Sequence, residues 1–356
     1  MILLAAIAAV HIALASPAPS STTVAATKSP SQIVADALIK LQAHLDVANR
    51  AMGEDQAEAL GSRLADDIEA FDDPTIISGY TPAAYQERLR NAATLDASIV
   101  DQVLSGKYEP LGGVSGLGER LIKSTTGGTW QPLALYVPRA LKPNPTLVVL
   151  LHGQPQTETN LLSPPYFQTL ADSTNSIIAA PWGRGNYDFY GVASDDVYQA
   201  ADEVARAYDI DPHRVFLAGY SMGGFSVFKI GPTHGSVWHA VLCIAGSILN
   251  SETASVMKAW KNTPIYVVNG KLDQSIPPMY GELTAVWLAG MGVPTGFYQE
   301  PKGTHFLPTL MPSLTQAWHD MIAGVVRNTP DVSQNGEGLP NGPNGLDTPD
   351  DKMPPR

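Results

Sequence analysis

The pattern of apolar positions divides the chain into an N-terminal part with helical periodicity and a longer part with continuous apolar runs. Between residues 31 and 106, apolar residues recur at alternating spacings of three and four, which places them along one face of a helix. The breaks in this pattern predict four helices, at residues 31–52, around 60–71, from Pro82 through Leu89, and over about 96–104. We interpret residues 31–110 as a helical region that packs on itself or on a neighbouring domain, and a cap over an active site is the alternative.

The pattern changes after the glycine-rich bridge at residues 111–118. Residues 120–124 and 132–137, separated by a Thr-Thr-Gly-Gly turn, predict an antiparallel pair of strands. Further short apolar runs follow, each typical of a strand that is buried on both faces, at residues 146–151, 177–180, 215–218, 240–245 and 265–268. Because stretches long enough for crossover helices separate them, residues 111–327 predict an α/β fold with a mainly parallel central sheet and helices on both faces.

The two ends of the chain have compositions that are unlike a folded domain. Residues 2–15 are apolar but too few to span a bilayer, and Ala13-Leu14-Ala15 fits a small-x-small cleavage site. We therefore predict a signal peptide at residues 1–15 and a secreted or periplasmic protein, although no Lys or Arg occurs before Lys28. Residues 16–30 predict a flexible linker, and the Pro-, Gly-, Asn- and Asp-rich residues 328–356 predict a disordered tail.

The composition argues against two classes of partner and excludes an intrachain disulfide. The 356 residues are enough for a sizeable core, and the formal net charge of −12 argues against nucleic acid or an anionic membrane surface as a partner. The single cysteine, Cys243, lies in an apolar run and excludes an intrachain disulfide. Nothing in the composition determines the oligomeric state.

The clearest chemical signal is the sequence Gly-Tyr-Ser-Met-Gly at residues 219–223, directly after the apolar run 215–218. A strand that turns sharply into a helix needs neighbours without a Cβ, and the residue at the apex of the turn is exposed at the strand end. Ser221 occupies that apex. A serine hydroxyl is a poor nucleophile at neutral pH, so it requires a base and a carboxylate that orients the base.

The loops after two later strands supply both groups. Asp273 follows the run 265–268, and His305 follows the predicted strand 297–300. In a parallel sheet these loops lie at the same edge as Ser221, so we predict Ser221 as nucleophile, His305 as base and Asp273 as its partner. The backbone N–H groups of Met222 and Gln154 are the predicted donors of an oxyanion hole.

These motifs resemble a known family. The four segments that carry the resemblance are Leu-Leu-His-Gly at 150–153, Pro-Trp-Gly-Arg-Gly at 181–185, Asp-Pro-His-Arg-Val at 211–215, and Gly-Tyr-Ser-Met-Gly-Gly at 219–224. Together they are similar to the α/β-hydrolase family, in its branch of secreted serine esterases and prolyl-oligopeptidase-like enzymes, which includes feruloyl-esterase-like and polyhydroxybutyrate-depolymerase-like proteins. The resemblance covers about residues 120–327 and implies the α/β-hydrolase fold. The propeller domain of prolyl oligopeptidases proper has no counterpart, because the preceding region is too short and too helical.

Substrate contacts carry a weaker signal. The loop that follows residues 177–180 is rich in aromatic side chains, which would either line a pocket or pack the loop onto the core. The predicted substrate-binding residues are His152, Trp182, Arg184, Tyr187 and Tyr190. No His-Glu-x-x-His, paired-cysteine or Gly-x-Gly-x-x-Gly spacing occurs, so we expect neither a metal ion nor another cofactor.

Three functional hypotheses follow. The first is a secreted serine hydrolase that cleaves carboxylic esters, of small molecules or polymers, through an acyl-enzyme on Ser221. The second is a serine peptidase that uses the same residues on an amide. The third is a non-catalytic binding protein on a hydrolase scaffold, against which the joint presence of Ser221, Asp273 and His305 argues. The sequence does not decide between ester and amide, or which acyl and alcohol groups are preferred.

Overall fold

The computed structural model describes residues 28–72, 81–185, 188–234 and 237–330. The predicted signal peptide, nearly all of the predicted linker and most of the predicted tail lie outside these residues. In the described part of the chain, none of the helices combines the length and the apolar character needed to cross a membrane.

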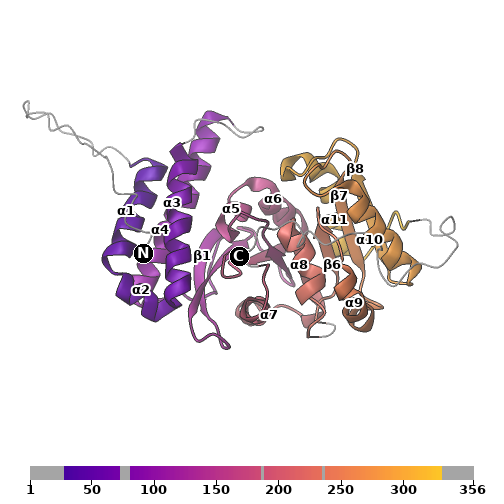
Figure 1. The fold of residues 1–356 in the computed structure, drawn as a ribbon, viewed down its shortest axis with the longest axis horizontal. Helices are drawn as coiled ribbons and strands as arrows, with labels where there is room; N and C mark the ends of the chain where they lie inside the picture. The colour runs from indigo at the N-terminus through magenta and orange to yellow at the C-terminus, as the bar shows by residue number, and fades with distance from the viewer. Residues whose placement is uncertain (1–27, 73–80, 186–187, 235–236, 331–356) are drawn as a thin grey trace, which may run out of the picture.

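One sheet of eight strands forms the centre of the described structure, in the spatial order β1-β2-β4-β3-β5-β6-β7-β8 (Figure 1). Its strands are β1 (Gly116–Lys123), β2 (Trp130–Val137), β3 (Thr146–Leu151), β4 (Ser176–Pro181), β5 (Val215–Tyr220), β6 (Val241–Ile244), β7 (Ile265–Gly270) and β8 (Thr295–Glu300). Strand β2 pairs antiparallel with both β1 and β4, and every pairing from β4 through β8 is parallel. The predicted hairpin and the predicted mainly parallel sheet are both confirmed.

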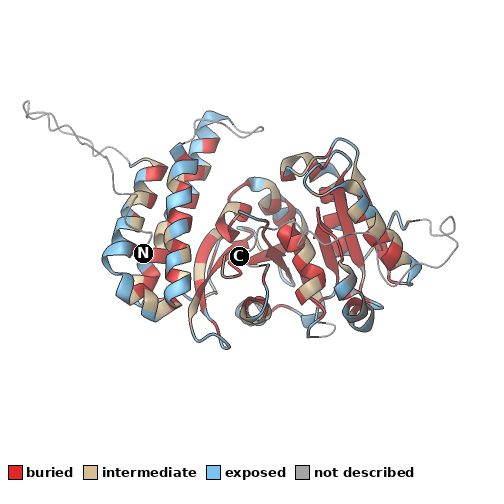
Figure 2. Ribbon diagram, viewed as in Figure 1, coloured by how far each residue is buried: buried red, intermediate tan, exposed pale blue. Residues whose placement is uncertain are grey.

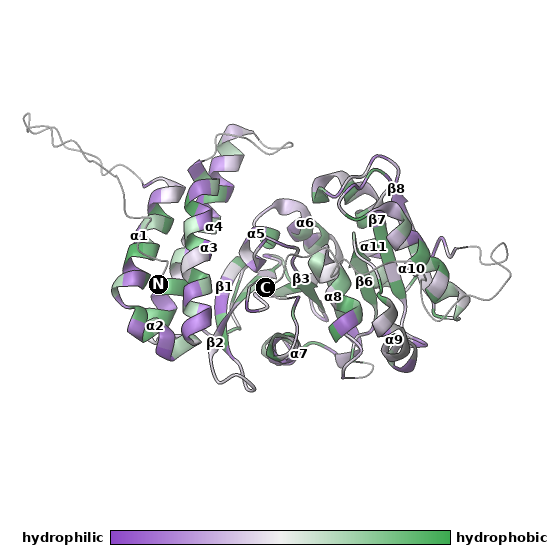
Figure 3. Cartoon of the chain, in the orientation of Figure 1, coloured by the Kyte–Doolittle hydropathy of each residue, from purple (hydrophilic) through white to green (hydrophobic). Residues whose placement is uncertain are grey.

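Helices cover both faces of this sheet, as predicted. The helices that follow β3 in the chain are α5 (Glu158–Leu162), α6 (Pro165–Thr174), α7 (Val192–Ala207), α8 (Met222–Ile230), α9 (Thr253–Trp260), α10 (Pro278–Gly290) and α11 (Leu307–Ala323), with short 3-10 turns at Pro212–Arg214 and Asn250–Glu252. Alternate residues of one strand enter different cores: Leu147 and Val149 pack with α7, α8 and α10, whereas Val148 packs with α6 and α11. This two-sided burial is why the strands read as continuous apolar runs (Figures 2 and 3).

The N-terminal region is helical, but its helices have different bounds from those predicted. They are α1 (Pro30–Ala43), α2 (Leu45–Met52), α3 (Glu54–Asp72) and α4 (Pro82–Ser105). The helix predicted over 31–52 is broken at His44, whose backbone leaves helical geometry at φ −132° and ψ 35°. Conversely, the two helices predicted within 82–104 form one helix, because no Gly or Pro interrupts this stretch and the apolar face continues through Ala92 and Ala93.

The beginning of α1 also corrects the predicted linker. The side chain of Ser29 accepts a hydrogen bond from the N–H of Gln32, and the side chain of Gln32 accepts one from the N–H of Ser29. This reciprocal capping box fixes the start of the helix at Pro30. Residues 29 and 30 therefore belong to the helical region.

The helical region packs against the β1 edge of the sheet (Figure 1). Its apolar stripes face one another and also enclose Leu121 of β1 and Trp182 of the loop after β4. This is the packing role predicted for the stripes. The alternative interpretation, a cap over the active site, has less support, because none of these four helices contributes a residue that lines the cavity beside Ser221.

A buried charge cluster joins the helical region to the sheet. Arg63 of α3 donates hydrogen bonds to Asp96 of α4 and to Glu158 of α5, each at 2.5 Å, and to the hydroxyl of Thr159 at 2.8 Å. Thr159 in turn donates to Glu119 of β1 at 3.2 Å. A buried ion pair adds little net stability compared with an apolar contact, but removing one member leaves an unpaired buried charge, which costs about 3–5 kcal/mol. The cluster therefore fixes how the two parts dock.

The cluster holds more carboxyl groups than its one guanidinium can compensate. Burial, and then the neighbouring Asp96 carboxylate, raise the pKa of Asp67 to about 8. Burial, and then Glu158, raise the pKa of Glu119 well above its usual range. Near neutral pH Asp67 therefore keeps a proton that it would release in the unfolded chain.

We therefore predict that folding stability falls as the pH rises from about 4 to about 8. In this window the folded protein binds more protons at Asp67 than the unfolded chain does, so raising the pH favours unfolding by roughly 1 kcal/mol per unit. Asp67→Asn cannot ionise, so its stability should depend less steeply on pH in urea unfolding between pH 5 and pH 9. Asp66→Asn, which alters the exposed neighbour, should follow the wild type. Parallel slopes for wild type and Asp67→Asn would contradict the assignment.

Candidate active site

Ser221 lies at the turn between β5 and α8, in a backbone conformation that L-residues rarely adopt. Its φ is 53° and its ψ is −116°, and its N–H donates to the carbonyl of Ile244 in the neighbouring strand β6 at 2.9 Å. The two nearby glycines leave no room for a side chain. A Cβ on Gly219 would overlap the carbonyl of Gly223, and one on Gly223 would overlap the carbonyl of Leu151. The turn therefore holds the Ser221 hydroxyl at the carboxyl edge of the sheet.

Ser221, His305 and Asp273 form one chain of hydrogen bonds, which we call the triad. The Ser221 Oγ lies 2.9 Å from His305 Nε2, and His305 Nδ1 lies 2.8 Å from Asp273 Oδ2. With the proton on Nδ1 donated to the carboxylate, Nε2 is free to accept the hydrogen bond of the serine hydroxyl. The structure thus brings together the three side chains that the sequence analysis assigned to nucleophile, base and acid.

Strand pairing places Asp273 beside His305. Strands β7 and β8 are parallel neighbours that pair as far as Gly270 and Glu300, and the N–H of Lys271 donates to the carbonyl of Glu300 at 2.9 Å. The two following loops therefore begin side by side. Asp273 is held further by its Oδ1, which accepts hydrogen bonds from the backbone N–H groups of residues 275 and 276 at 2.9 and 2.8 Å. Only 4% of Asp273 is exposed, so its carboxylate has one orientation toward the imidazole.

Tyr220, the residue before Ser221, contacts His305 through both its hydroxyl and its ring. Its hydroxyl donates a hydrogen bond to the backbone carbonyl of His305, and the two rings stack with centroids 5.5 Å apart. Burial, and then the charge of Asp273, raise the pKa of Tyr220 to about 12, so the phenol stays protonated and remains a donor. The sequence analysis did not assign this role, although Tyr220 directly precedes Ser221.

Two residues with backbone N–H groups, Met222 and Gln154, line the same cavity as Ser221. Met222 is the first residue of α8, where N–H groups have no acceptor within the helix, and Gln154 lies in the loop after β3. The loop and the helix are tied together by the N–H of Gly223, which donates to the carbonyl of His152 at 3.0 Å. Within the described residues, the N–H groups of Met222 and Gln154 have no hydrogen-bond partner. Both are therefore available to a ligand.

The strand order and the sharp turn at Ser221 between β5 and α8 are those of the α/β-hydrolase fold. The profile of the prolyl oligopeptidase family also matches residues 182–261, which contain β5, the Ser221 turn and α8.

A curated relative is similar over part of this chain. It is the bifunctional acetylxylan esterase/xylanase XynS20E of Neocallimastix patriciarum, 31% identical over 156 residues. The match covers 41% of the chain and 22% of the relative, so the chain spans about a fifth of the relative's length.

Solved structures are similar at lower identity. The serine hydrolase FphF of Staphylococcus aureus is 17% identical at a TM-score of 0.49, with 59% of this chain and 99% of the other covered. A ferulic acid esterase is 17% identical at a TM-score of 0.48, with 58% and 97% covered.

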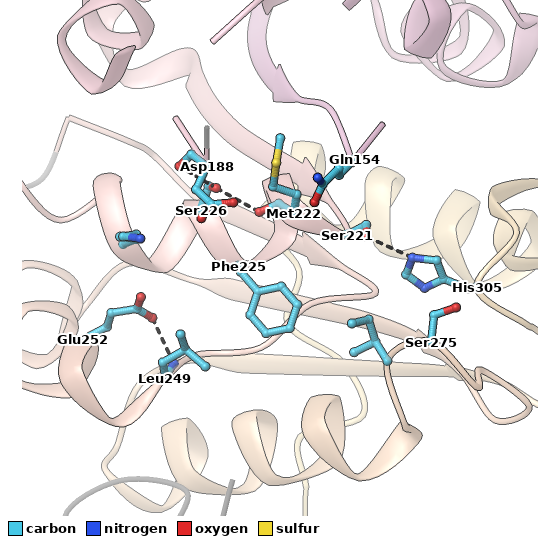
Figure 4. Close-up of a pocket in the computed structure, with 12 residues that line it drawn as sticks. Gln154, Asp188, Ser221, Met222, Phe225, Ser226, Leu249, Glu252, Ser275 and His305 are labelled. Atoms are coloured by element: carbon cyan, nitrogen blue, oxygen red, sulfur yellow. Dashed lines mark hydrogen bonds between the residues drawn. The ribbon is translucent and has the colours of Figure 1, made fainter. Parts of the chain in front are cut away.

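A cavity of about 340 Å³ opens beside the triad, and Ser221 and His305 line it. Its lining residues are Gln154, Asp188, Ser221, Met222, Phe225, Ser226, Lys229, Leu249, Glu252, Ser275, Ile276 and His305 (Figure 4). Ser221, Phe225 and Lys229 are spaced by four residues, so the cavity follows one face of α8 over about 12 Å. Phe225 lies between the triad and the side where Asp188 and Glu252 are found (Figure 4). The cavity thus combines an apolar middle with a charged far end.

Most of the predicted substrate-binding residues lie elsewhere. Trp182 is 2% exposed and packs among the N-terminal helices, and Arg184 donates to Asp196 of α7 at 2.7 Å. His152 is 1% exposed, and its Nε2 lies 2.9 Å from the carbonyl of Trp182. These three do not line the cavity beside Ser221, because tertiary packing and an ion pair turn them into the structure.

The remaining two predicted contacts have different outcomes. Tyr190 is 69% exposed, and the Lys229 ammonium lies 4.8 Å from its ring centre, so it stands near the charged end of the cavity without lining it. Tyr187 lies outside the described residues. The sequence analysis missed Phe225 and Lys229, which the helical spacing from Ser221 could have identified.

In the parts of the chain that the structure describes, no group of three or more His, Cys, Asp or Glu side chains is arranged to hold a metal ion.

We predict that Gly219→Ala lowers the free energy of unfolding by about 2 kcal/mol or more, because the added Cβ overlaps backbone that cannot move without displacing the Ser221 turn. Gly61→Ala in α3 is the matched control. A Cβ there meets only one side-chain atom, at 3.9 Å, so the change should stabilise the helix by about 0.5–1 kcal/mol. Chemical denaturation of the two variants measures both effects. Equal stabilities would show that the turn tolerates a side chain.

Proposed function

We propose that the chain is a serine hydrolase that cleaves carboxylic esters through an acyl-enzyme on Ser221. One observation carries the proposal: a continuous hydrogen-bonded triad ends, at the mouth of a cavity, beside two backbone N–H groups without partners. Acyl transfer requires a nucleophile, a base and donors for the developing oxyanion, and this arrangement supplies each of them.

In the first step, the Ser221 Oγ attacks the ester carbonyl carbon while His305 Nε2 takes the hydroxyl proton. The carbonyl oxygen becomes an oxyanion that the N–H groups of Met222 and Gln154 stabilise. The carboxylate of Asp273 stabilises the imidazolium that forms. Collapse of the tetrahedral intermediate breaks the bond to the alcohol oxygen, which receives the proton from His305 and leaves.

In the second step, a water molecule replaces the alcohol. His305 takes a proton from the water as its oxygen attacks the acyl carbon, and the same donors hold the new oxyanion. The bond to Ser221 Oγ then breaks, Oγ recovers the proton from His305, and the carboxylic acid departs. The ion pair of imidazolium and Asp273 forms twice per turnover, which explains the need for a fixed carboxylate.

Esters are favoured as substrates by the curated relative, whose name includes acetylxylan esterase. The match to the prolyl oligopeptidase family favours a second candidate, a peptidase that uses the same residues on an amide. The helical region does not provide the propeller of that family, since the described residues 30–72 and 82–105 fold into four helices. The third hypothesis, a binding protein without activity, is separated from both by the assay below.

Secretion is part of the proposal and is supported by the apolar residues 2–15 and the cleavage pattern before Ser16. Expression of the full chain in a secreting host should give a mature protein in the medium that begins at Ser16. An intact N-terminus, identified by mass spectrometry, would contradict the predicted signal peptide.

The assay compares short-chain p-nitrophenyl esters with aminoacyl p-nitroanilides. Ser221→Ala should lower kcat for the ester by about a million-fold, with a comparable loss in His305→Ala, because neither the nucleophile nor the base is then present. Asp273→Asn should lose about ten-thousand-fold, because it holds the imidazole in the wrong tautomer. Ser105→Ala, an exposed serine at the end of α4, is the matched control and should retain full activity.

Each other outcome has a definite meaning. Amide turnover above ester turnover would favour the peptidase. Full activity in Ser221→Ala would overturn the nucleophile assignment, and the absence of any hydrolysis by the folded wild type would favour the binding protein.

A further inference from the structure

The two ends of the cavity beside Ser221 differ in chemistry. His305 lies on one side of Ser221, whereas Phe225, Asp188 and Glu252 lie on the other side, with Phe225 nearer to the triad (Figure 4). All of these residues line the same cavity. An ester bound over Ser221 therefore extends in two directions, one toward His305 and the other along α8.

The proton transfers of ester cleavage decide which part of the substrate takes which direction. The alcohol oxygen receives its proton from His305 Nε2, so it must lie within hydrogen-bond reach of the imidazole. In the proposed reaction the carbonyl oxygen points at the N–H groups of Met222 and Gln154. The remaining substituent of the carbonyl carbon is the acyl chain, and the direction left to it leads along α8, away from His305.

The cavity along α8 is apolar for a limited distance. Its apolar lining residues are Met222, Phe225, Leu249 and Ile276. Phe225 follows Ser221 by one helical turn, about 6 Å, and Lys229 follows by two turns, about 12 Å. A fully extended chain of single bonds advances about 1.2 Å per bond. A hexanoyl chain therefore reaches the level of Phe225, and a decanoyl chain extends most of the way to Lys229.

Charged side chains end this apolar section. Lys229, Asp188 and Glu252 line the far end, and Lys229 and Asp188 are only half-buried, so water still reaches them. A methylene group placed there would displace this water without offering a hydrogen bond, which is unfavourable. Two carboxylates and one ammonium, which already lies over the Tyr190 ring, also disfavour a further carboxylate. The far end therefore limits the length of the acyl chain.

We propose that the cavity along α8 is an acyl pocket that takes apolar acyl chains of about four to six carbons, and that Phe225 and Lys229 determine this length. This inference rests on the proposed ester hydrolysis for the assignment of the acyl side, and on the lining residues for the length preference. Phe225 provides the apolar surface that a lengthening chain contacts. Lys229 sets the point at which further methylenes bring no gain.

The first test compares two isomeric esters, ethyl hexanoate and hexyl acetate, in a pH-stat assay. Because the isomers contain the same atoms, the ratio of their kcat/KM values reports which side of the ester the cavity accepts. We expect ethyl hexanoate to be preferred about a hundredfold, since each methylene buried in the acyl pocket contributes about fourfold. Equal values, or faster cleavage of hexyl acetate, would overturn the proposal.

Phe225→Ala should reduce this preference about tenfold, because it removes the ring that the acyl chain contacts. Met291→Ala shortens an exposed apolar side chain at the end of α10 and is the matched control, which should keep the wild-type preference. The preference is a ratio measured within one protein, so it is independent of how much of a variant folds. An unchanged preference in Phe225→Ala would contradict the role of Phe225.

The second test follows kcat/KM along the p-nitrophenyl esters of acetate, butanoate, hexanoate and decanoate. In the wild type we expect a rise through hexanoate and no further rise to decanoate. Lys229→Met keeps an unbranched side chain without the charge, so its value for decanoate should exceed that of the wild type at least tenfold. Lys261→Met, at an exposed lysine after α9, is the matched control and should follow the wild type.

Two results would overturn the length limit at Lys229. One is a wild-type rise that continues to decanoate, and the other is a Lys229→Met profile equal to that of the wild type. Faster cleavage of monoethyl adipate than of ethyl hexanoate would also overturn it, because the far end would then bind a charged terminus.

A third measurement separates the pocket from the reaction. Full-length Ser221→Ala protein is titrated with ethyl acetate and ethyl hexanoate by calorimetry, and Phe225→Ala is added to the same background. We expect ethyl hexanoate to bind at least tenfold more tightly than ethyl acetate, with most of this difference lost in the double variant. If the wild type hydrolyses no ester but this difference is found, the proposed reaction fails while the pocket stands. Ester hydrolysis without any dependence on acyl length, in rate or in binding, would overturn the pocket alone.

Discussion

The left-handed backbone at Ser221 is the constraint on which the rest of the site depends. A non-glycine residue at a φ of 53° persists only where the surroundings leave no alternative. Here the N–H of Ser221 is tied to β6, and the start of α8 is tied to the loop after β3 through Gly223 and His152. The same two ties position the N–H groups of Met222 and Gln154. The strain at one residue thus aligns the nucleophile with both backbone donors.

The positions of His305 and Asp273 depend on a different feature, the register of β7 and β8. Their parallel pairing continues past the last strand residues, so the loops carrying Asp273 and His305 leave the sheet together. Gly270 permits this close approach, because a Cβ there would overlap the backbone of Gly303. Tyr220 connects these two features of the site. Its hydroxyl donates a hydrogen bond to the backbone carbonyl of His305, and its own backbone leads into the Ser221 turn. Nucleophile and base are therefore adjusted to each other through one side chain.

The sequence predicts those parts of the structure that local patterns determine. Continuous apolar runs identify buried strands, because a strand covered on both faces has no polar side. Gly219 and Gly223 identify the turn, and the placement of polar residues just after strands brings Asp273 and His305 to the same edge as Ser221. Helix bounds were harder to predict, since the break at His44 has no Gly or Pro to mark it. The sequence does not predict whether an aromatic side chain packs in the core or lines a pocket, because an indole such as that of Trp182 suits both environments. Only tertiary packing decides between the two.

The buried charges at Arg63 illustrate what no local pattern can predict. Arg63, Asp96, Glu119 and Glu158 are scattered over almost a hundred residues, and each alone is typical of a solvated helix face or strand edge. In the fold these four side chains are buried together, and one guanidinium faces three carboxyl groups. The cluster therefore contributes less to the free energy of unfolding than an apolar contact of the same size would. An arrangement of this kind is useful where it restricts docking to one orientation, because any shift of α3 would leave several charges unpaired. Here it holds α3 and α4 at a fixed position relative to β1 and α5.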